Sequence, residues 1–460
     1  MKKIAILGGG IAGLTAAYEL ARLNKVGANI EAVLFEASNR LGGIIETVHE
    51  QGFTIECGPD GWVTEKPWAR ELVEELGLAA EIIPSLDAGR KTYILQDGKL
   101  VAIPDGMRMM VPANQDALAA IEHSELFSEA AKAACVAEPE RAADLRAQAP
   151  STDESVAAFV RRHFGEEMLQ KIGAPLLSGV FGGNVETLSV RAVMPAFVAM
   201  EQEHGSLIAA LRARETKQQP IFSTLHTGLS SLLEAMISRI PADWIRLNQA
   251  VHSISRDGDA WVVKGKQIVD GERFDAVLLA APADIARELL RPIDNRAAEL
   301  MQMEASSAVV VGLGFAEKFA LPQGFGFLAP EGEGSSLLAC TFVDQKFPGR
   351  APANTRLLRA FFGGAAAESI TEMDDAAIAA IAQRELATIL GTLPEPIVTV
   401  VRRWPRSLPQ YAVGHLDRMA ELDARIHALP NLHLLGNGYR GVGLPDVIRD
   451  ARTAARATAK

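Results

Sequence analysis

Short, mostly apolar runs bounded by glycine or polar residues occur near both ends of the chain. Residues 3–7 and 30–35 open it in this way, and residues 274–282 and 431–435 follow much later. Runs of this length are typical of parallel strands buried on both faces. Residues 14–20, between the first two runs, have a helical pattern. We therefore predict an α/β protein whose parallel sheet is assembled from distant parts of the chain.

A second sheet is predicted from apolar and alternating segments elsewhere. A hairpin is expected over residues 92–103, turning at Asp97-Gly98. An amphipathic helix is expected at residues 376–390. Strands of this sheet are expected at residues 308–315, 337–342 and 356–361, and a further strand is expected at residues 398–404.

Between the two sheets the pattern changes. From about residue 114 to residue 200, strand signals nearly vanish and Ala-rich helical patterns dominate. This stretch predicts a helical insertion. Within it, the charged residues 138–153 predict an exposed loop or a weak helix.

Composition narrows the class of protein. The chain has 460 residues, of which 48% are hydrophobic and 22% charged, and this predicts an ordinary globular protein of two or three domains. The net charge of −11, without a sustained Lys/Arg stripe, argues against nucleic-acid binding.

Cysteine use and hydropathy bear on the compartment. Cys57, Cys135 and Cys340 are widely spaced and form no C-x-x-C, which favours a reducing compartment over a disulfide scaffold and argues against a zinc or other metal site. We find no window of about 18 uninterrupted apolar residues, so no transmembrane helix is predicted. The chain is expected in the cytoplasm, with at most peripheral contact to a membrane.

The strongest local motif is the glycine loop at residues 8–13, Gly-Gly-Gly-Ile-Ala-Gly, between the first strand and the first helix. In such a loop Gly8 makes the tight turn, Gly10 lets the backbone approach a pyrophosphate, and Gly13 lets the helix pack on the strand. Glu36 ends the next strand, where an acid takes ribose hydroxyls. Turn glycines without a ligand are the alternative. The strand, glycines, helix, second strand and acid in register favour dinucleotide binding.

A second glycine loop lies near the end of the chain. Residues 436–443 follow a predicted strand and precede a helix that begins at Leu444-Pro445-Asp446. Proline in the first turn and an acid near the positive helix end are typical of a helix start. The loop is either a plain helix cap or a second anion cradle, and in the latter case both loops would hold one extended cofactor.

Residues 8–13, Glu36 and residues 40–43 resemble the FAD fingerprint of the amine-oxidase and protoporphyrinogen-oxidase superfamily. Four further segments make the chain similar to the oxygen-dependent porphyrinogen oxidases of haem synthesis. These segments are Gly58-Pro59-Asp60-Gly61, residues 175–184 (Pro-Leu-Leu-Ser-Gly-Val-Phe-Gly-Gly-Asn), residues 408–415 (Leu-Pro-Gln-Tyr-Ala-Val-Gly-His) and residues 439–446 (Tyr-Arg-Gly-Val-Gly-Leu-Pro-Asp). Residues 138–150 carry no usable resemblance.

The resemblance implies three domains. A Rossmann-type, PHBH-like FAD-binding domain would comprise residues 1–84, 220–300 and 402–460. A mixed-sheet substrate domain would comprise residues 85–111 and 301–401. The helical insertion, residues 112–219, would line the substrate entrance.

The resemblance also implies non-covalent FAD and assigns residues to it. The family often has Lys after the double glycine, where this chain has Ile44, so that contact would be lost or made by backbone. The cofactor-binding residues carried over are Gly8, Gly9, Gly10, Ile11, Ala12, Gly13, Glu36, Ala37, Arg40, Gly42, Gly43, Gly58, Pro59, Asp60, Gly61, Val251, Trp404, Gly436, Val442, Gly443 and Leu444.

The implied reaction is repeated hydride transfer from a porphyrinogen to flavin N5, with O2 as the acceptor. No dedicated protein nucleophile is expected, because the flavin carries the chemistry; His204, His226 and His415 are interpreted as structural or exposed. Lys66 is the preferred clamp for a substrate carboxylate, ahead of Arg90, Lys91 and Arg108, although solvated surface charge is the simpler interpretation of each. The substrate-binding residues carried over are Lys66, Leu177, Gly179, Phe325 and Gly326.

The spacing from Gly58 to Lys66 resembles the bacterial branch that uses coproporphyrinogen III, and protoporphyrinogen IX is the alternative substrate. A flavin amine oxidase, a carotenoid desaturase and a non-catalytic porphyrin carrier stay open as more distant alternatives. For a porphyrinogen oxidase, the next enzyme of the haem pathway, ferrochelatase, is the expected partner. Ordinary core packing is the alternative reading of Phe325 and Gly326.

Overall fold

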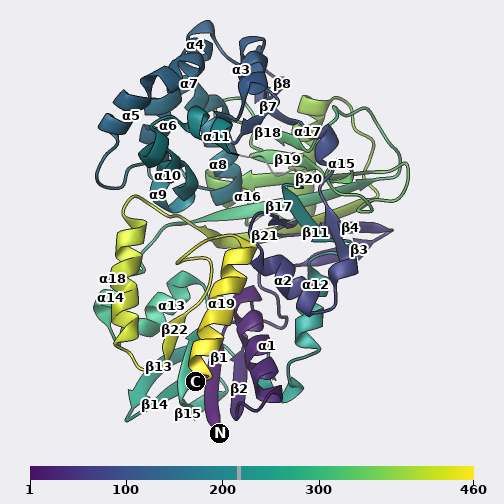
Figure 1. Ribbon diagram of the computed structural model, residues 1–460. Helices are drawn as coiled ribbons and strands as arrows, with labels where there is room; N and C mark the ends of the chain where they lie inside the picture. Colours follow the sequence, from purple (N-terminus) through teal and green to yellow (C-terminus); the bar gives the residue numbers. More distant parts are fainter. Residues whose placement is uncertain (215–218) are drawn as a thin grey trace.

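The computed structural model describes residues 1–214 and 219–460, which are arranged in three parts (Figure 1). A parallel sheet with its helices lies at the end of the molecule that carries both termini. A mixed sheet lies in the middle, and a block of helices lies at the opposite end. The predicted α/β class, with a second sheet and a helical insertion, is confirmed.

The parallel sheet draws its strands from both ends of the chain, as predicted. The order is β12-β2-β1-β16-β22, and every pairing is parallel. The strands are β1 (Lys2–Leu7), β2 (Ile30–Phe35), β12 (Ile245–Arg246), β16 (Ala276–Leu279) and β22 (Leu432–Leu434).

Successive residues of β1 point to opposite faces of this sheet, and both faces are covered. Ile4 and Ile6 face a helical layer, while Ala5 and Leu7 face an antiparallel sheet of three strands. Burial on both faces explains the continuous apolar runs in the sequence. The helices are α1 (Ile11–Lys25), α2 (Trp68–Glu75), α12 (Ser230–Ile237) and α19 (Leu444–Thr458), and the antiparallel strands are β13 (Val251–Asp257), β14 (Ala260–Gly265) and β15 (Ile268–Phe274).

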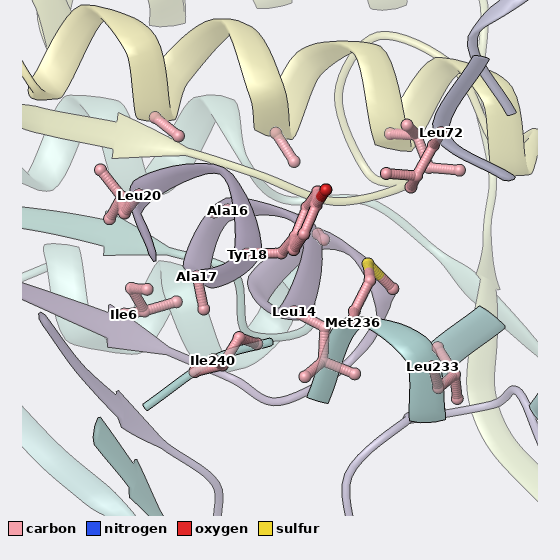
Figure 2. Close-up of a cluster of buried hydrophobic side chains, with 14 of the residues drawn as sticks. Ile6, Leu14, Ala16, Ala17, Tyr18, Leu20, Leu72, Leu233, Met236 and Ile240 are labelled. Atoms are coloured by element: carbon pink, nitrogen blue, oxygen red, sulfur yellow. The ribbon is translucent and has the colours of Figure 1, made fainter. Parts of the chain in front are cut away.

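The helical layer closes around α1. Its side chains fill the space between β1 and the neighbouring helices α2 and α12 (Figure 2). Close packing of this kind fixes the position of α1, and therefore of the glycine loop at its start. The buried residues labelled in Figure 2 are Ile6, Leu14, Ala16, Ala17, Tyr18, Leu20, Leu72, Leu233, Met236 and Ile240.

The mixed sheet has the order β21-β17-β20-β19-β18-β7-β8, in which only the β18–β7 pairing is parallel. Helices α16 (Gly364–Ile370) and α17 (Asp375–Leu390) cover one face, and the hairpin of β3 (Thr47–Glu50) and β4 (Phe53–Glu56) packs on the other. The strands are β7 (Thr92–Gln96), β8 (Lys99–Ala102), β17 (Ala305–Phe315), β18 (Gly326–Leu328), β19 (Ala339–Phe342), β20 (Arg356–Gly363) and β21 (Val398–Pro409).

One strand crosses a predicted domain boundary. Residues Val398 to Pro409 form a single strand, β21, which pairs with β17 of the mixed sheet as far as Pro409. The predicted boundary at residue 402 would divide this strand. The boundary is therefore better placed after Pro409, although the assignment of functions to the three domains stays a prediction.

The helical block has its own buried core. Its helices are α3 (Gln115–Glu122), α4 (Glu129–Ala137), α5 (Ala142–Gln148), α6 (Val156–Phe164), α7 (Glu166–Met168), a π-helical turn (Leu169–Gly173), α8 (Ala174–Phe181), α9 (Val190–Val193), α10 (Pro195–His204) and α11 (Leu207–Ala213). The predicted insertion ran to residue 219, and residues 215–218 lie outside the described residues.

The remaining elements connect the three parts. In the described part of the chain, no helix is long and apolar enough to span a membrane. The connecting strands and helices are β5 (Trp62–Val63), β6 (Ile82–Pro84), β9 (Met107–Arg108), β10 (Val111–Pro112), β11 (Phe222–Leu225), α13 (Ala283–Leu290), α14 (Asn295–Leu300), α15 (Val343–Lys346) and α18 (His415–His427), with single 3-10 turns at Ala79–Glu81, Asp87–Gly89, Glu138–Arg141 and Ala242–Trp244.

The prediction that residues 138–153 form an exposed loop or weak helix was wrong at its first residue. Glu138 is fully buried. Its carboxylate lies 2.9 Å from Nδ1 of His163, accepts the N–H of Leu207 at 2.8 Å, and accepts the hydroxyl of Ser206. Because its partners come from α6 and from the start of α11, the local sequence gave no sign of this burial.

His163 lies between two carboxylates. Its Nδ1 contacts Glu138 and its Nε2 contacts Glu201, each at 2.9 Å, and Arg162 also pairs with Glu201. Burial would lower the pKa of His163, but the hydrogen bonds to the two glutamates raise it above its ordinary value. The imidazolium form therefore stabilises the helical block.

We expect this stabilisation to depend on pH. A raised pKa contributes stability that is fully present below the unfolded value of about 6.5 and is lost as the pH rises through the folded value. Urea denaturation should show this loss when it is repeated at several values between pH 6 and pH 9. Unfolding of the helical block is monitored at each pH by limited proteolysis. The loss should be smaller in His163→Gln, which cannot ionise. Equal pH slopes for the two proteins would contradict the assignment.

Candidate functional site

The first glycine loop joins β1 to α1 and is shaped by close backbone contacts. A Cβ on Gly13 would lie 1.9 Å from the carbonyl oxygen of Gly8, so glycine is required for the helix to start this close to the strand. Gly10 caps α1 with a φ of −72°, and the nearest neighbour of a Cβ there would be the Cα of Gly43 at 4.0 Å. The space beside Gly10 is therefore open. The first turn of α1 carries no acidic side chain, so no negative charge of the protein would repel an anion from the positive end of this helix.

Glu36 ends β2 and turns its carboxylate back to this loop. One oxygen accepts the N–H of Gly9 at 2.7 Å, and the other accepts the N–H of Ser38 at 2.8 Å. The backbone carbonyl of Glu36 accepts the N–H of Gln249 at 2.8 Å. Val251, the first residue of β13, lies two residues beyond this contact. The structure thus brings together the segments expected at the ribose and at the adenine.

The turn at residues 40–43 covers the first loop. The N–H of Gly42 donates to the carbonyl of Gly9 at 2.8 Å. The guanidinium of Arg40 lies over the ring of Trp404, 5.8 Å from its centroid. This turn therefore links the first glycine loop to β21 of the mixed sheet.

The segment Gly58–Gly61 lies against the same turn. A Cβ on Gly58 would lie 1.9 Å from the carbonyl oxygen of Ile44, so glycine is needed for this approach. The indole N–H of Trp404 donates to the carbonyl of Cys57 at 2.6 Å. The two segments and Trp404 are therefore in direct contact with one another. Ile44 takes part in it through its backbone.

Asp60 in this segment is held by two cations. Its carboxylate lies 2.8 Å from the ammonium of Lys346 and 3.3 Å from the guanidinium of Arg359. Burial alone would raise the pKa of Asp60, but these two cations outweigh burial and lower the pKa to about 2. Arg359 also donates to the carbonyl of Gly58. Asp60 therefore holds its segment in place as a carboxylate at neutral pH.

Sequence reasoning missed the cations around Asp60. Arg359 is 1% exposed in β20, and Arg350, also 1% exposed, lies 3.3 Å from Glu56 and donates to Thr224 at 2.7 Å. A charged residue is rarely buried without a partner. An arginine within the apolar run of β20 was the available signal, but its partners are distant in sequence.

The second glycine loop, residues 436–443, joins β22 to α19. Gly436 has a φ of +128° and Gly441 a φ of +149°, both in the region that favours glycine. Gly443 caps α19, and Val442 and Leu444 flank it. This loop follows a strand of the same parallel sheet as the first glycine loop, at the same edge, because both precede a helix at the carboxyl end of a parallel strand.

Lys66 lies beside this second loop in an ion pair. Its ammonium is 2.5 Å from the carboxylate of Asp446, and its side chain is 44% exposed. Arg449 is a second cation on Asp446, at 3.3 Å. A substrate carboxylate bound by Lys66 would therefore compete with, or share, the contact to Asp446.

The other residues expected at the substrate lie in two environments. Leu177 is fully buried in the core of the helical block, whereas Gly179 is exposed and lies beside Leu328 of β18. Phe325 is 9% exposed. A Cβ on Gly326 would lie 1.9 Å from the carbonyl oxygen of Cys340, so the pairing of β18 with β19 already requires glycine there. Gly179 is thus the more open of these positions.

Comparison with known proteins decides the family. Residues 11–459 match the family described as flavin containing amine oxidoreductase. The chain belongs to this family. The resemblance drawn from the sequence motifs is confirmed at this level, and membership implies a flavin cofactor.

Individual relatives of this flavin oxidoreductase extend over almost the whole chain. The coproporphyrinogen III oxidase of Bacillus subtilis (strain 168) is 33% identical over 98% of this chain and 97% of its own length. The chloroplastic protoporphyrinogen oxidase of Oryza sativa subsp. japonica is 27% identical over 98% and 87%. A crystal structure from Exiguobacterium sp. 255-15, provisionally named a protoporphyrinogen oxidase, is 32% identical with a TM-score of 0.87, covering 100% of this chain and 98% of that one.

The described residues fit the flavin that the family implies. The open space beside Gly10 lies at the positive end of α1, and the first loop is joined without a break to residues 40–43 and to Gly58–Gly61. The sheet places the second glycine loop on the same edge. An extended cofactor with a pyrophosphate would meet backbone amides and small side chains along this line.

Proposed function

We propose that this protein is an FAD-dependent oxidase that converts coproporphyrinogen III to coproporphyrin III, with O2 as the electron acceptor. The observation that carries the proposal is the match to the coproporphyrinogen III oxidase of Bacillus subtilis along nearly the full length of both chains. The continuous line of glycine segments across the two sheets supports the cofactor.

In this proposal the protein positions the cofactor through its backbone. The first glycine loop would hold the pyrophosphate, and the carboxylate of Glu36, which accepts the N–H of Gly9, would lie near the ribose hydroxyls. Val251 would contact the adenine, and Gly58–Gly61 and Trp404 would contact the isoalloxazine. A bound flavin would supply the acceptor for the hydride that leaves a meso carbon of the substrate. The chain's own contribution is to orient the substrate and to exclude water.

Non-covalent attachment is supported by the positions of the cysteines. Cys57, Cys135 and Cys340 are 1%, 1% and 2% exposed. Cys340 lies in β19 within the core of the mixed sheet, and burial raises the pKa of Cys57 to about 11. A buried neutral thiol is a poor nucleophile, so none of the three is suited to a thioether link.

Protoporphyrinogen IX is the second candidate substrate. It is favoured by the name of the Exiguobacterium structure and by the match to the plant enzyme at 27% identity. The two substrates differ in the number of carboxylates, so cations at the entrance should discriminate between them. Transfer of the product to ferrochelatase and peripheral contact with a membrane stay predictions.

An anaerobic titration of the purified yellow protein tests the proposed function. Coproporphyrinogen III and protoporphyrinogen IX are added in parallel while the visible band of the flavin is followed, and air is then admitted while porphyrin fluorescence is measured. Faster bleaching by coproporphyrinogen III is the expected result. Faster bleaching by protoporphyrinogen IX would favour the second candidate, and no bleaching by either would exclude the oxidase.

The Lys66→Met variant should bind coproporphyrinogen III, which carries four carboxylates, more weakly. Its binding of protoporphyrinogen IX, which carries two carboxylates, should be weakened less. The side chain is 44% exposed and adjoins the second glycine loop, so loss of one charged contact should raise the KM for coproporphyrinogen III by about tenfold, or ~1.4 kcal/mol. Arg70→Met is the matched control, because Arg70 is an exposed cation paired with Glu74 on α2. Equal losses for both substrates would remove Lys66 from the specificity argument.

A further inference from the structure

We infer that Tyr411 and His415 are positioning residues that hold the second glycine loop in the conformation that receives the flavin. This inference rests on the proposed binding of FAD. Tyr411 lies in the segment that follows β21, and His415 is the first residue of α18. His415 was predicted from its sequence context to be structural or exposed, and Tyr411 was assigned no role.

The side chains of this pair make three hydrogen bonds to the loop. The hydroxyl of Tyr411 donates to the carbonyl of Asn437 at 2.5 Å and accepts the N–H of Gly441 at 3.0 Å. Nε2 of His415 lies 2.9 Å from the carbonyl of Tyr439. Since a carbonyl only accepts, His415 must donate through Nε2. The contacts therefore fall on alternate residues along the loop.

The pair is rigid and shielded from water. Tyr411 is 3% exposed and His415 is fully buried, and their rings stack with centroids 3.9 Å apart at an interplanar angle of 11°. Burial lowers the pKa of His415 to about 4, so the ring stays neutral and its hydrogen bond persists through the physiological pH range. Hydrogen bonds from a buried, stacked pair cost little entropy to maintain.

The segment is also anchored on its other side, to the helical block. The carbonyl of Tyr411 accepts the N–H of Ser189 at 2.7 Å, and the N–H of Val413 donates to Thr187 at 2.9 Å. The N–H of Gly414 donates to the carboxylate of Asp153 at 2.8 Å. The pair is thus fixed by the helical block and in turn fixes the loop.

The loop needs such support because of its composition. Glycines at 436, 438, 441 and 443 give it a large conformational freedom, and two of them adopt a positive φ. Ordering such a loop only when a ligand arrives would reduce affinity, and ordering it beforehand removes that cost. External hydrogen bonds to the carbonyl of Asn437 and the N–H of Gly441 order it beforehand.

The variant Tyr411→Phe isolates this role, since it keeps the ring, the stacking and the backbone contacts and removes both hydroxyl bonds to the loop. We expect the Kd of the apoprotein for FAD to rise by about tenfold or more, measured by quenching of flavin fluorescence. The visible circular dichroism of the bound flavin should change as well, which a loss of stability alone would not produce.

Tyr18→Phe is the matched control. Tyr18 lies near the middle of α1 and donates its hydroxyl to Glu75 at 2.8 Å, so its variant also removes one hydroxyl bond of a buried tyrosine. Its Kd for FAD should stay within about twofold of the wild-type value. If Tyr411→Phe fails to fold, His415→Ala and His415→Gln replace it, because a Gln amide restores a donor toward the carbonyl of Tyr439.

The outcomes separate the two proposals. Wild-type protein without affinity for FAD overturns the proposed function. FAD-binding wild type with an unchanged Kd and flavin dichroism in Tyr411→Phe overturns the positioning role alone. For the histidine variants, a raised Kd in His415→Ala with recovery in His415→Gln supports the role, and equal Kd values in His415→Ala and the wild type overturn it.

Discussion

The Gly10→Val variant should purify colourless, with its affinity for FAD reduced by at least about a hundredfold, or ~2.8 kcal/mol. Gly10 caps α1, and the nearest neighbour of a Cβ there is 4.0 Å away, so the space beside it is open. The two methyl groups of valine would fill the space where the backbone is proposed to meet the pyrophosphate. Absorbance of the purified protein at the flavin band measures the result.

The backbone conformation of Gly10 should let the valine variant fold, so loss of FAD can be distinguished from loss of the fold. A φ of −72° in an extended conformation is accessible to valine, so the variant should fold and melt within a few degrees of the wild-type apoprotein. Gly10→Ala adds a single carbon and should lose less affinity than the valine variant. A valine variant that retains the full yellow colour would remove Gly10 from the proposed cofactor site.

Glu138→Ala should lower the local stability of the helical block by about 3 kcal/mol. The substitution leaves His163 with one carboxylate and removes the acceptor for the hydroxyl of Ser206 and the N–H of Leu207, all of which are buried. Breaking a buried ion pair on one side costs more than the pair contributes, because the remaining charge stays desolvated. Hydrogen exchange of α6 and α11 measures the loss.

A matched variant lies two residues away. Glu140 is exposed on the same 3-10 turn, so Glu140→Ala should change the same exchange rates by no more than about 0.5 kcal/mol. Similar effects of the two substitutions would show that the turn, rather than the buried carboxylate, holds the helices together.

The elements predicted well from sequence are those whose signal is local. The strand at residues 30–35 was predicted with the observed bounds, because burial on both faces leaves an unbroken apolar run. The hairpin was predicted from its Asp97-Gly98 pair, and both residues adopt the positive φ that such turns require. The family could also be predicted from the sequence, because each of its glycine motifs is a contiguous segment of the chain.

The features that sequence reasoning missed depend on partners distant in the chain. Lys66 meets Asp446, 380 residues away. Asp60 meets Lys346, 286 residues away, and Glu138 meets His163 and α11 across the helical block. A single sequence gives the charge of each residue but does not give its neighbours, so burial and pairing of these groups became visible only in the fold.

The order of strands in the parallel sheet has a consequence for synthesis on the ribosome. The edge strand β22 and the covering helix α19 come from residues 432–458, whereas β1 and α1 come from the first 25 residues. A growing chain therefore cannot complete this sheet until the last strand has left the exit tunnel, although the helices between residues 115 and 213 are contiguous and can form earlier. Until β22 has been synthesised, β16 exposes the edge on which β22 pairs.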